Sequence, residues 1–363
     1  MQNGQDFDAL KNARIFVGLS GGVDSAVSAA LLQKTGAAIT GVFIKGWYPP
    51  DMPCTWADDR RDAMRVAAFL RIPFYTLDAS VEYKKGVIDY LIGEYAQGRT
   101  PNPDIMCNRE VKFGAYYSFA RSKRVDFIAT GHYARVAPRE LQHATAPSPS
   151  RLLRGINDTK DQSYFLWAVP KETIDHTLFP LGEFKKERVR ELAKEYKLPV
   201  AEKKDSQGIC FLGSISVDDF LRQELSPEDG KAIDAEGKEV GIHEGAVLYT
   251  LGQRLSLKNA PEGPWYVLKK DMHENMLTVG STADVPAITQ NIHLTQTNWF
   301  SDTSIENEIL QAQYRYHGPT ILGTLNKARD IFTLNEPLLQ PIAGGQSLVL
   351  YREDECLGGG IIA

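Results

Sequence analysis

The sequence has few cysteines, no long apolar run and no excess of positive charge. Its 363 residues include only four cysteines, which lie far apart and form no CxxC pair. Neither a disulfide framework nor a zinc knuckle is therefore indicated. No run approaches the roughly 18 apolar residues of a transmembrane helix, and the first residues, MQNGQDFDAL, do not read as a signal peptide. We expect a cytoplasmic protein with no membrane partner.

Length and charge bound the domain count and the kind of partner. A chain of 363 residues with 43% hydrophobic and 24% charged residues suits two or three globular domains. The net charge of -5 argues at first against a nucleic-acid partner. However, residues 1–217 hold 30 basic and 25 acidic side chains, whereas residues 218–285 hold 7 and 13 and residues 286–363 hold 4 and 8. The positive charge lies in the first part of the chain, which permits RNA binding there.

The first 130 residues alternate strand-like and helical patterns. The strand-like runs are Ile15–Leu19, Ala38–Ile44, Phe74–Leu77 and Phe127–Thr130. The runs with helical spacing are Asp24–Gln33, Trp56–Leu70 and Val81–Tyr95, and a further one follows at Lys185–Tyr196. This alternation predicts an α/β fold, a doubly wound parallel sheet with helices on both faces. Ligands of such a sheet bind at the carboxyl ends of the strands.

The rest of the chain reads as β-structure. Glycines punctuate the sequence after Ser214, and the short runs Ala246–Thr250 and Trp265–Leu268 predict short strands. Alternating residues in Ile309–Tyr316, Ile331–Leu334 and Ser347–Tyr351 predict a small closed β-structure. We expect three domains: an α/β domain over 1–217, a small mostly-β central domain over 218–284 and a C-terminal β-barrel over 285–363. The polar stretch Pro138–Ser150 is interpreted as a surface loop or insert.

The strongest local signal is IFVGLSGGVDSAVSAALL, residues 15–32, an apolar strand followed by a glycine-rich loop and a helix. Gly21 and Gly22 let backbone amides approach an anion closely, and Ser20 and Ser25 add hydroxyl donors. The helix N-terminus adds a positive dipole. A phosphate or pyrophosphate site is predicted here, the alternative being an ordinary glycine turn. The spacing matches neither GxxxxGK[ST] nor GxGxxG.

A second unusual segment is RTPNPDIMCN, residues 99–108. Its two prolines predict an extended loop that presents Asn102 and Asp104. Cys107 precedes a helical run with Arg109 and Lys112, an arrangement that would lower the pKa of its thiol. The alternative is a buried, inert cysteine.

Of the other three cysteines, one is a candidate for a reactive thiol and two are interpreted as structural. Cys210 follows two lysines and Gly208 in KKDSQGICF, which suits an activated thiol on a loop and equally a core cysteine. Cys54 and Cys356 lack such surroundings and are interpreted as structural.

Several motifs run in one order along nearly the whole chain: SGGVDS, GVFIKGW, GRTPNPDIMCN, ATGHYA, RLLRG, KDQSYFL, FPLGEFKK, KKDSQGICF, LGQR, EGPWYV and CLGGGII. The first resembles the PP-loop of the ATP pyrophosphatases. Together they resemble the bacterial tRNA-specific 2-thiouridylases over residues 13–363. One departure is the segment after LGQR, which reads LSLKNAPEGPWYV where that family has a glycine-rich stretch.

The resemblance implies an enzyme, a tRNA-uridine 2-sulfurtransferase. ATP, with Mg²⁺, would activate the C2 oxygen of the wobble uridine as an adenylate, and a persulfide sulfur would then replace that oxygen. No dedicated metal site is expected. The partners would be the glutamate, glutamine and lysine tRNAs and a sulfur donor, either a cysteine desulfurase or a relay carrier. We expect a monomer.

The resemblance also assigns residues. Nucleotide binding falls to Gly18, Leu19, Ser20, Gly21, Gly22, Val23, Asp24, Ser25, Ile44 and Gly131. The target base would meet Asn102, Pro103 and Asp104, with Asp104 also catalytic. Cys210 would carry the persulfide, and Cys107 would be the nucleophile that releases its sulfur, either as free sulfide or with a Cys107–Cys210 disulfide left after transfer. Contacts with tRNA would come from His132, Lys160, Asp161, Gln162, Arg315, Tyr316 and Gln346.

Each tRNA assignment has a structural alternative. His132 could be an ordinary core histidine, and the Lys160–Gln162 turn could be the start of a helix capped by Asp158 or Thr159. Arg315 and Tyr316 could lie on a solvated strand face, and Gln346 in a polar turn. Two other functions stay open, a ligase that adenylates a small acid for attack by ammonia, and an RNA-binding protein without ATP chemistry.

Overall fold

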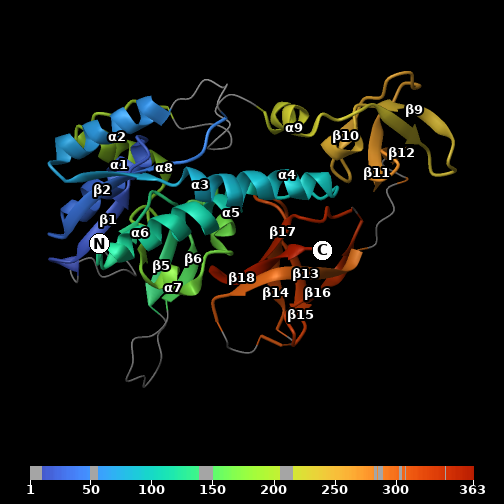
Figure 1. The fold of residues 1–363 in the computed structure, drawn as a ribbon. Coiled ribbons are helices and arrows are strands. Elements are labelled where there is room, and N and C mark those ends of the chain that lie inside the picture. The colour runs from blue at the N-terminus through green and yellow to red at the C-terminus, as the bar shows by residue number, and fades with distance from the viewer. Residues whose placement is uncertain are drawn as a thin grey trace.

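Three β-sheets organise the part of the chain that the computed structural model describes (Figure 1). The structure describes residues 10–49, 56–138, 150–204, 216–281, 284, 289–301, 305–306, 308–339 and 341–363. Among these residues, no helix combines the length and the apolar character that crossing a membrane requires.

The first sheet is parallel and has the strand order β3-β2-β1-β4-β7. Its strands are β1 (Arg14–Gly18), β2 (Ala38–Lys45), β3 (Phe74–Asp78), β4 (Phe127–Ala129) and β7 (Thr177–Leu178). Its neighbouring helical elements are α1 (Val23–Gln33), α2 (Trp56–Leu70), α3 (Ser80–Tyr83), η2 (Lys84–Ile88), α4 (Asp89–Ala96), α5 (Pro103–Met106), η3 (Cys107–Ala115), α6 (Tyr116–Ser122) and α8 (Lys186–Glu195). The predicted strands and helices are confirmed to within two residues.

Alternating side chains of the strands bury two separate cores. Ile15 and Val17 of β1 pack with α1, α2 and α8 on one face. Phe16 points the other way and packs with the helical segments between residues 83 and 120. The sheet is therefore covered on both faces, as expected of buried parallel strands.

The second sheet is smaller and has the order β10-β11-β12-β8-β9. Its strands are β8 (Gly230–Ile233), β9 (Glu239–His243), β10 (Arg254–Leu255), β11 (Trp265–Asp271) and β12 (Met276–Gly280), and α9 (Val217–Leu225) precedes them. The strand predicted at Ala246–Thr250 is wrong, because Ala246–Leu248 forms the 3-10 helix η5. There the amide of Ala246 donates to Asn275 Oδ1 and that of Leu248 to Gly245 O, instead of to a neighbouring strand.

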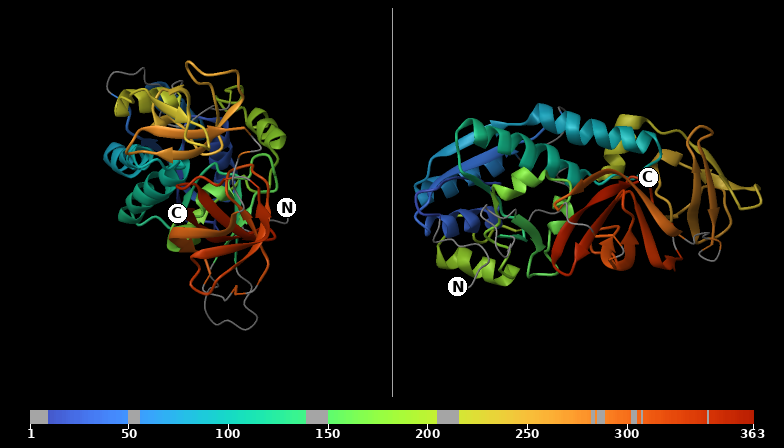
Figure 2. Two further views of the ribbon diagram at one scale, coloured as in Figure 1. Left: turned by 90° about the vertical axis from the view of Figure 1, so that its right-hand side faces the viewer. Right: turned by 90° about the horizontal axis from the view of Figure 1, so that it is seen from below.

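The third sheet closes into a six-stranded antiparallel barrel, which confirms the predicted closed β-structure. Its strands are β13 (Thr289–Trp299), β14 (Leu310–Gln313), β15 (Ile321–Leu325), β16 (Ile331–Leu338), β17 (Ser347–Arg352) and β18 (Glu355–Ile362). Pairing of β13 with β18 completes the ring. Figure 2 shows the barrel beside the helices of the first sheet, with the small sheet at the end of the molecule.

A hairpin from the first part of the chain extends the barrel sheet. It consists of β5 (Ala134–Pro138) and β6 (Ser150–Arg154), and β6 pairs with β18. The 3-10 helix η4 (Ser163–Leu166) and α7 (Lys171–Asp175) follow. The strand-like RLLRG segment thus joins a sheet formed mostly by residues about 200 positions later, so the barrel is tied to the α/β part by backbone hydrogen bonds.

Polar side chains reinforce this junction. The guanidinium of Arg154 lies 3.5 Å from the ring centroid of Tyr351 on β17. The buried carboxylate of Asp161 accepts hydrogen bonds from the amides of Gly155 and Ser163 and from Ser163 Oγ, and it pairs with Arg154 at 3.4 Å. The start of η4 is therefore bound by Asp161, not by Asp158 or Thr159.

Replacing Asp161→Ala should lower the free energy of unfolding by about 3–5 kcal/mol, because it removes the carboxylate that pairs with Arg154 and leaves the amides of Gly155 and Ser163 without their acceptor. Urea denaturation measures this change. The control Glu239→Ala breaks the exposed pair with Lys231 and should cost less than about 1 kcal/mol. Equal effects of the two substitutions would contradict the structural role of Asp161.

Candidate active site

The glycine-rich loop connects β1 to α1 at the carboxyl edge of the parallel sheet. Gly22 is the N-cap residue of α1 and has no side chain with which to bind the first amides of the helix. Gly21 has φ +79°, and a Cβ there would lie 2.3 Å from Asp59 O. Position 21 therefore requires glycine, whereas Gly22 leaves the first amides of α1 without a side-chain cap, so the helix N-terminus stays open to an anion.

The serine hydroxyls of the loop point toward each other. Ser20 Oγ and Ser25 Oγ lie 3.2 Å apart, and Ser25 Oγ donates to Gly22 O. By contrast, the side chains of Leu19 and Val23 are buried in the core. Any contact of these two residues with a nucleotide must be made by their backbone.

Asp24 lies at the centre of a small network. Its carboxylate accepts from Tyr133 Oη at 2.8 Å and from Lys186 Nζ at 2.7 and 2.8 Å. Sequence reasoning gave neither partner a role. Lys186 is in the first turn of α8, where a cation opposes the helix dipole, and this unfavourable placement was the signal that could have singled it out.

Three of the predicted nucleotide contacts lie at one edge of the sheet. Gly18 ends β1, Ile44 is next to the last residue of β2, and Gly131 follows β4. A Cβ on Gly131 would lie 2.9 Å from the amide nitrogen of Ser25. Gly131 thus lies directly against the start of α1, with no room for a side chain.

His132 lies in the environment of a core histidine. Its Nδ1 is 2.8 Å from Thr130 Oγ1, and its ring packs against the rings of Phe113 and Phe179. Burial lowers the pKa of His132 to about 3, so the ring is neutral at physiological pH. Contact of His132 with tRNA stays a prediction.

The predicted extended loop is shorter than expected, because a helix already begins at Pro103 and includes Asp104. Asn102 is extended, but Pro103 already occupies the first position of α5, where its fixed φ suits a helix. Asn102 Oδ1 accepts from the amides of Asp104 and Ile105, so Asn102 is the N-cap. Burial raises the pKa of the partly buried Asp104, while the charge of Lys112 acts in the opposite direction.

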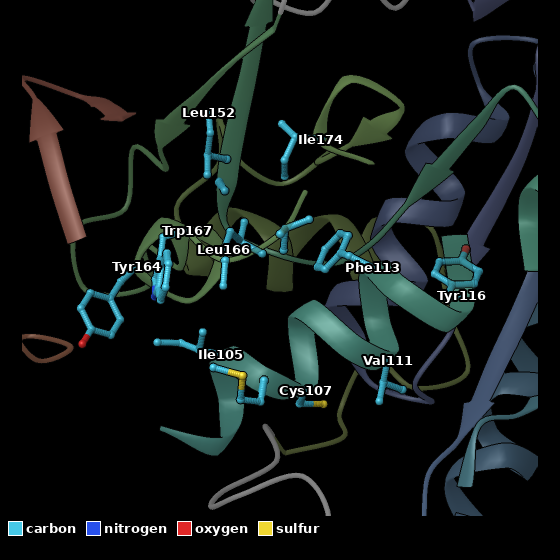
Figure 3. Packing of buried hydrophobic residues seen from close by; sticks show 14 of the residues in the cluster. Ile105, Cys107, Val111, Phe113, Tyr116, Leu152, Tyr164, Leu166, Trp167 and Ile174 are labelled. Atoms are coloured by element: carbon cyan, nitrogen blue, oxygen red, sulfur yellow. The ribbon is translucent and has the colours of Figure 1, made fainter. Parts of the chain in front are cut away.

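Cys107 is the first residue of η3 and only 3% exposed. Figure 3 shows it at the edge of the apolar cluster that includes Ile105, Val111 and Trp167. The side-chain amide of the neighbouring residue, Asn108, donates to Phe165 O. Cys210, its proposed partner, and Cys54 lie outside the described residues. Cys356 is buried, and burial raises the pKa of its thiol to about 12, which suits a structural cysteine.

The predicted tRNA contacts lie along the junction with the barrel. Gln162 exchanges hydrogen bonds with the backbone of Tyr133, next to half-buried Lys160. Arg315 is exposed, and the ring of Tyr316 lies 4.4 Å from that of Phe165. Gln346 donates to Thr100 O at 2.7 Å. Their contact with RNA stays a prediction.

Gly131→Ala should weaken nucleotide binding by about tenfold or more, because its Cβ displaces the amides at the start of α1. Calorimetric titration with ATP measures the loss. Gly93→Ala is the matched control, since a Cβ there meets nothing within 4 Å, and it should bind ATP as the unsubstituted protein does. Unchanged affinity in Gly131→Ala would refute this placement of the nucleotide.

The chain matches three family models in order. Their descriptions are tRNA methyl transferase HUP domain over residues 13–214, tRNA methyl transferase PRC-barrel domain over 218–281 and aminomethyltransferase beta-barrel domain over 289–362. Among solved structures, the U34-tRNA thiolase NcsA from Methanococcus maripaludis is similar over 60% of this chain and 66% of its own, with a TM-score of 0.36 and 17% identity. So weak a likeness says nothing about function.

Curated relatives match far better. The tRNA-specific 2-thiouridylase MnmA of Acinetobacter baylyi is 42% identical over 96% of both chains. That of Psychrobacter arcticus is 40% identical over 96% of this chain and 90% of its own. The protein therefore belongs to the tRNA-specific 2-thiouridylase family, a family of tRNA-modifying transferases.

Proposed function

We propose that this protein catalyses the ATP-dependent 2-thiolation of the wobble uridine of tRNA. In this reaction the C2 oxygen of uridine attacks the α-phosphorus of ATP, and pyrophosphate leaves. A sulfur atom then displaces the oxygen, which departs with AMP. The substrates would be the glutamate, glutamine and lysine tRNAs, and a desulfurase or relay protein would supply the sulfur.

We call the glycine-rich loop at residues 18–25 the phosphate loop and the helical residues 103–115 the cysteine segment. The observation that carries this proposal is that residues 131 and 132 contact both of them. Gly131 lies against Ser25 of the loop, and the ring of His132 lies 5.4 Å from that of Phe113 on η3. Phe113 lies on η3, which begins with Cys107 and directly follows α5, the helix that carries Asp104. The glycine-rich loop and the segment that carries the thiol thus both contact residues 131 and 132, just beyond the carboxyl end of β4, from opposite faces of the sheet. This arrangement supports an enzyme that combines ATP chemistry with a thiol.

The loop fits a nucleotide with its magnesium ion. Its amides and the α1 N-terminus suit phosphate oxygens, and Lys186 adds a positive charge beside Asp24. The hydroxyls of Ser20 and Ser25 and the carboxylate of Asp24 are hard oxygen donors of the kind that Mg²⁺ accepts. The ion would neutralise phosphate charge, while Lys186 and the amides hold the phosphates in position.

Asp104 is suited to handle the proton of the uridine. Because burial raises the pKa of its carboxyl group, this side chain binds a proton more readily than an exposed aspartate. Asn102 and Pro103, which fix the start of α5, would hold the flipped base beside it.

The two thiols would carry the sulfur. The terminal sulfur of a Cys210 persulfide attacks C2 of the adenylated uridine. The Cys107 thiolate attacks the inner sulfur of Cys210, so that the sulfur–sulfur bond of the persulfide breaks and a Cys107–Cys210 disulfide forms. The disulfide is the two-electron oxidised product, and an external thiol must reduce it before the next turnover.

Cys107→Ser and Cys210→Ser should each abolish thiouridine formation while ATP and tRNA still release pyrophosphate, because adenylation needs neither thiol. Nucleoside analysis measures thiouridine formation, and an assay coupled to pyrophosphate release measures adenylation. Cys356→Ser, at a buried site in the barrel, is the control and should keep both activities. Full product formation by both single variants would refute the persulfide route, and a small acid that replaces tRNA as the trigger for pyrophosphate release would favour a ligase.

The pH dependence of the reaction tests Asp104. If its carboxylate accepts the proton, kcat/KM should fall as the pH drops through the raised pKa of Asp104, at a higher pH than for an exposed aspartate. Asp104→Asn should lower kcat/KM by about 10²–10⁴-fold and remove this acidic limb. An Asn variant that keeps the acidic limb would contradict the assignment.

A further inference from the structure

Three parts of the chain meet at residues 98–100, immediately before the loop that we propose to hold the target base. The amide of Thr100 donates to Gly344 O in the barrel at 2.8 Å, and Gln346 Nε2 donates to Thr100 O. Thr100 Oγ1 lies 3.1 Å from Thr250 Oγ1 in the central part of the chain. One residue of the α/β part is thus bonded to both of the other parts.

Lys270 adds a second link from the central sheet. Its ammonium donates to Gly98 O at 3.1 Å and to Tyr249 O at 2.5 Å. Gly98 lies just beyond the end of α4, where helix carbonyls lack partners in the helix and a positive charge is favourable. In Figure 1, α4 ends between the small sheet and the barrel.

The position of Lys270 removes part of the hydration of its ammonium group, which is unfavourable for the charged form. The side chain is half-buried, and burial lowers the pKa of Lys270 to about 8. Charged groups on the adjacent elements α4 and α9 pair with other partners: Glu94 with Arg99, and Arg222 with Asp218 and Glu244. The two carbonyl oxygens therefore offset the desolvation of the ammonium.

The backbone at this junction is closely fitted. Gly345 has φ +89°, and a Cβ there would lie 3.0 Å from Arg99 Cβ and from Thr100 N. Gly98 has φ +76°, and a Cβ would lie 2.7 Å from Met272 Cγ. Both the barrel and the central sheet thus contact this segment with no space for an added side chain.

A displacement of Thr100 would also shift residues 101–104, the base loop, which we propose to hold the target base. Only Pro101 separates Thr100 from Asn102, and Pro103 follows, so two of the next three residues have a fixed φ. Asn102 then caps α5 through the amides of Asp104 and Ile105. Stiff backbone therefore connects the junction to the side chain proposed to exchange the proton.

We propose that Lys270 is a positioning residue for thiolation: it holds Gly98 directly and Thr100 through Tyr249 and the adjacent Thr250, and thereby sets the placement of Asn102 and Asp104 against the target base. This inference rests on the proposed function. It assigns the central sheet a part in the chemical step, in addition to any contact that it makes with RNA.

The test compares Lys270→Met, Lys270→Arg and the control Lys269→Met, which removes an exposed lysine from the same strand. Lys270→Met should lower kcat by about 10- to 100-fold, with KM for tRNA within about threefold of the unsubstituted value. Lys270→Arg, which can still donate to both carbonyls, should recover most of kcat, and Lys269→Met should leave kcat unchanged. Thr250→Val should act in the same direction as Lys270→Met.

Hydrogen exchange of the full chain provides a readout that needs no reaction. Amides of residues 98–106 should exchange faster in Lys270→Met than in Lys269→Met. Equal exchange in these two variants, or a rise in KM with unchanged kcat, would overturn the proposal. If even the unsubstituted enzyme makes no thiouridine, the proposed function fails, and exchange alone decides whether Lys270 orders this segment. Should Lys270→Met not fold, Thr250→Val and Lys270→Arg decide by the same criteria.

Discussion

The close approach of Gly131 to the start of α1 is the constraint on which the site depends. It brings the end of β4 within contact of the phosphate loop, and the next residue, His132, packs on the helical segment that carries Cys107. A neutral, buried His132 bonded to Thr130 keeps this connection rigid. The phosphate loop and the cysteine segment, about 80 residues apart in sequence, are thereby fixed relative to each other.

The barrel is also held firmly to the α/β part. Pairing of β6 with β18 makes the β5–β6 hairpin part of the barrel sheet. At this junction Arg154 pairs with the buried carboxylate of Asp161 and lies over the ring of Tyr351. The barrel reaches Thr100, which directly precedes the base loop, through Gly344 and Gln346. A tRNA bound across these parts would therefore meet a surface of fixed shape, which favours precise placement of one base.

Local sequence pattern predicted much of the fold and the position of the glycine-rich loop between β1 and α1. Strand and helix periodicities between residues 14 and 130 come from side chains that face one core or the other, so they are visible in the sequence. The Asp24–Lys186 pair joins residues 162 positions apart, and the pairing of β6 with the barrel spans about 200, so no local pattern contains either. The run at Ala246–Leu248 has strand-like composition, but the amide of Ala246 donates to Asn275 Oδ1 and the amide of Leu248 donates to Gly245 O, and these bonds favour a 3-10 helix.

The central claim is that a uridine of tRNA exchanges its C2 oxygen for sulfur at this site. The most direct test is mass analysis of nucleosides from tRNA incubated with the protein, ATP, and a cysteine desulfurase with cysteine, which supplies sulfur at the persulfide level. One uridine should gain the mass of sulfur in place of oxygen, and only when protein and ATP are both present. An unchanged nucleoside mass, with pyrophosphate released, would contradict it.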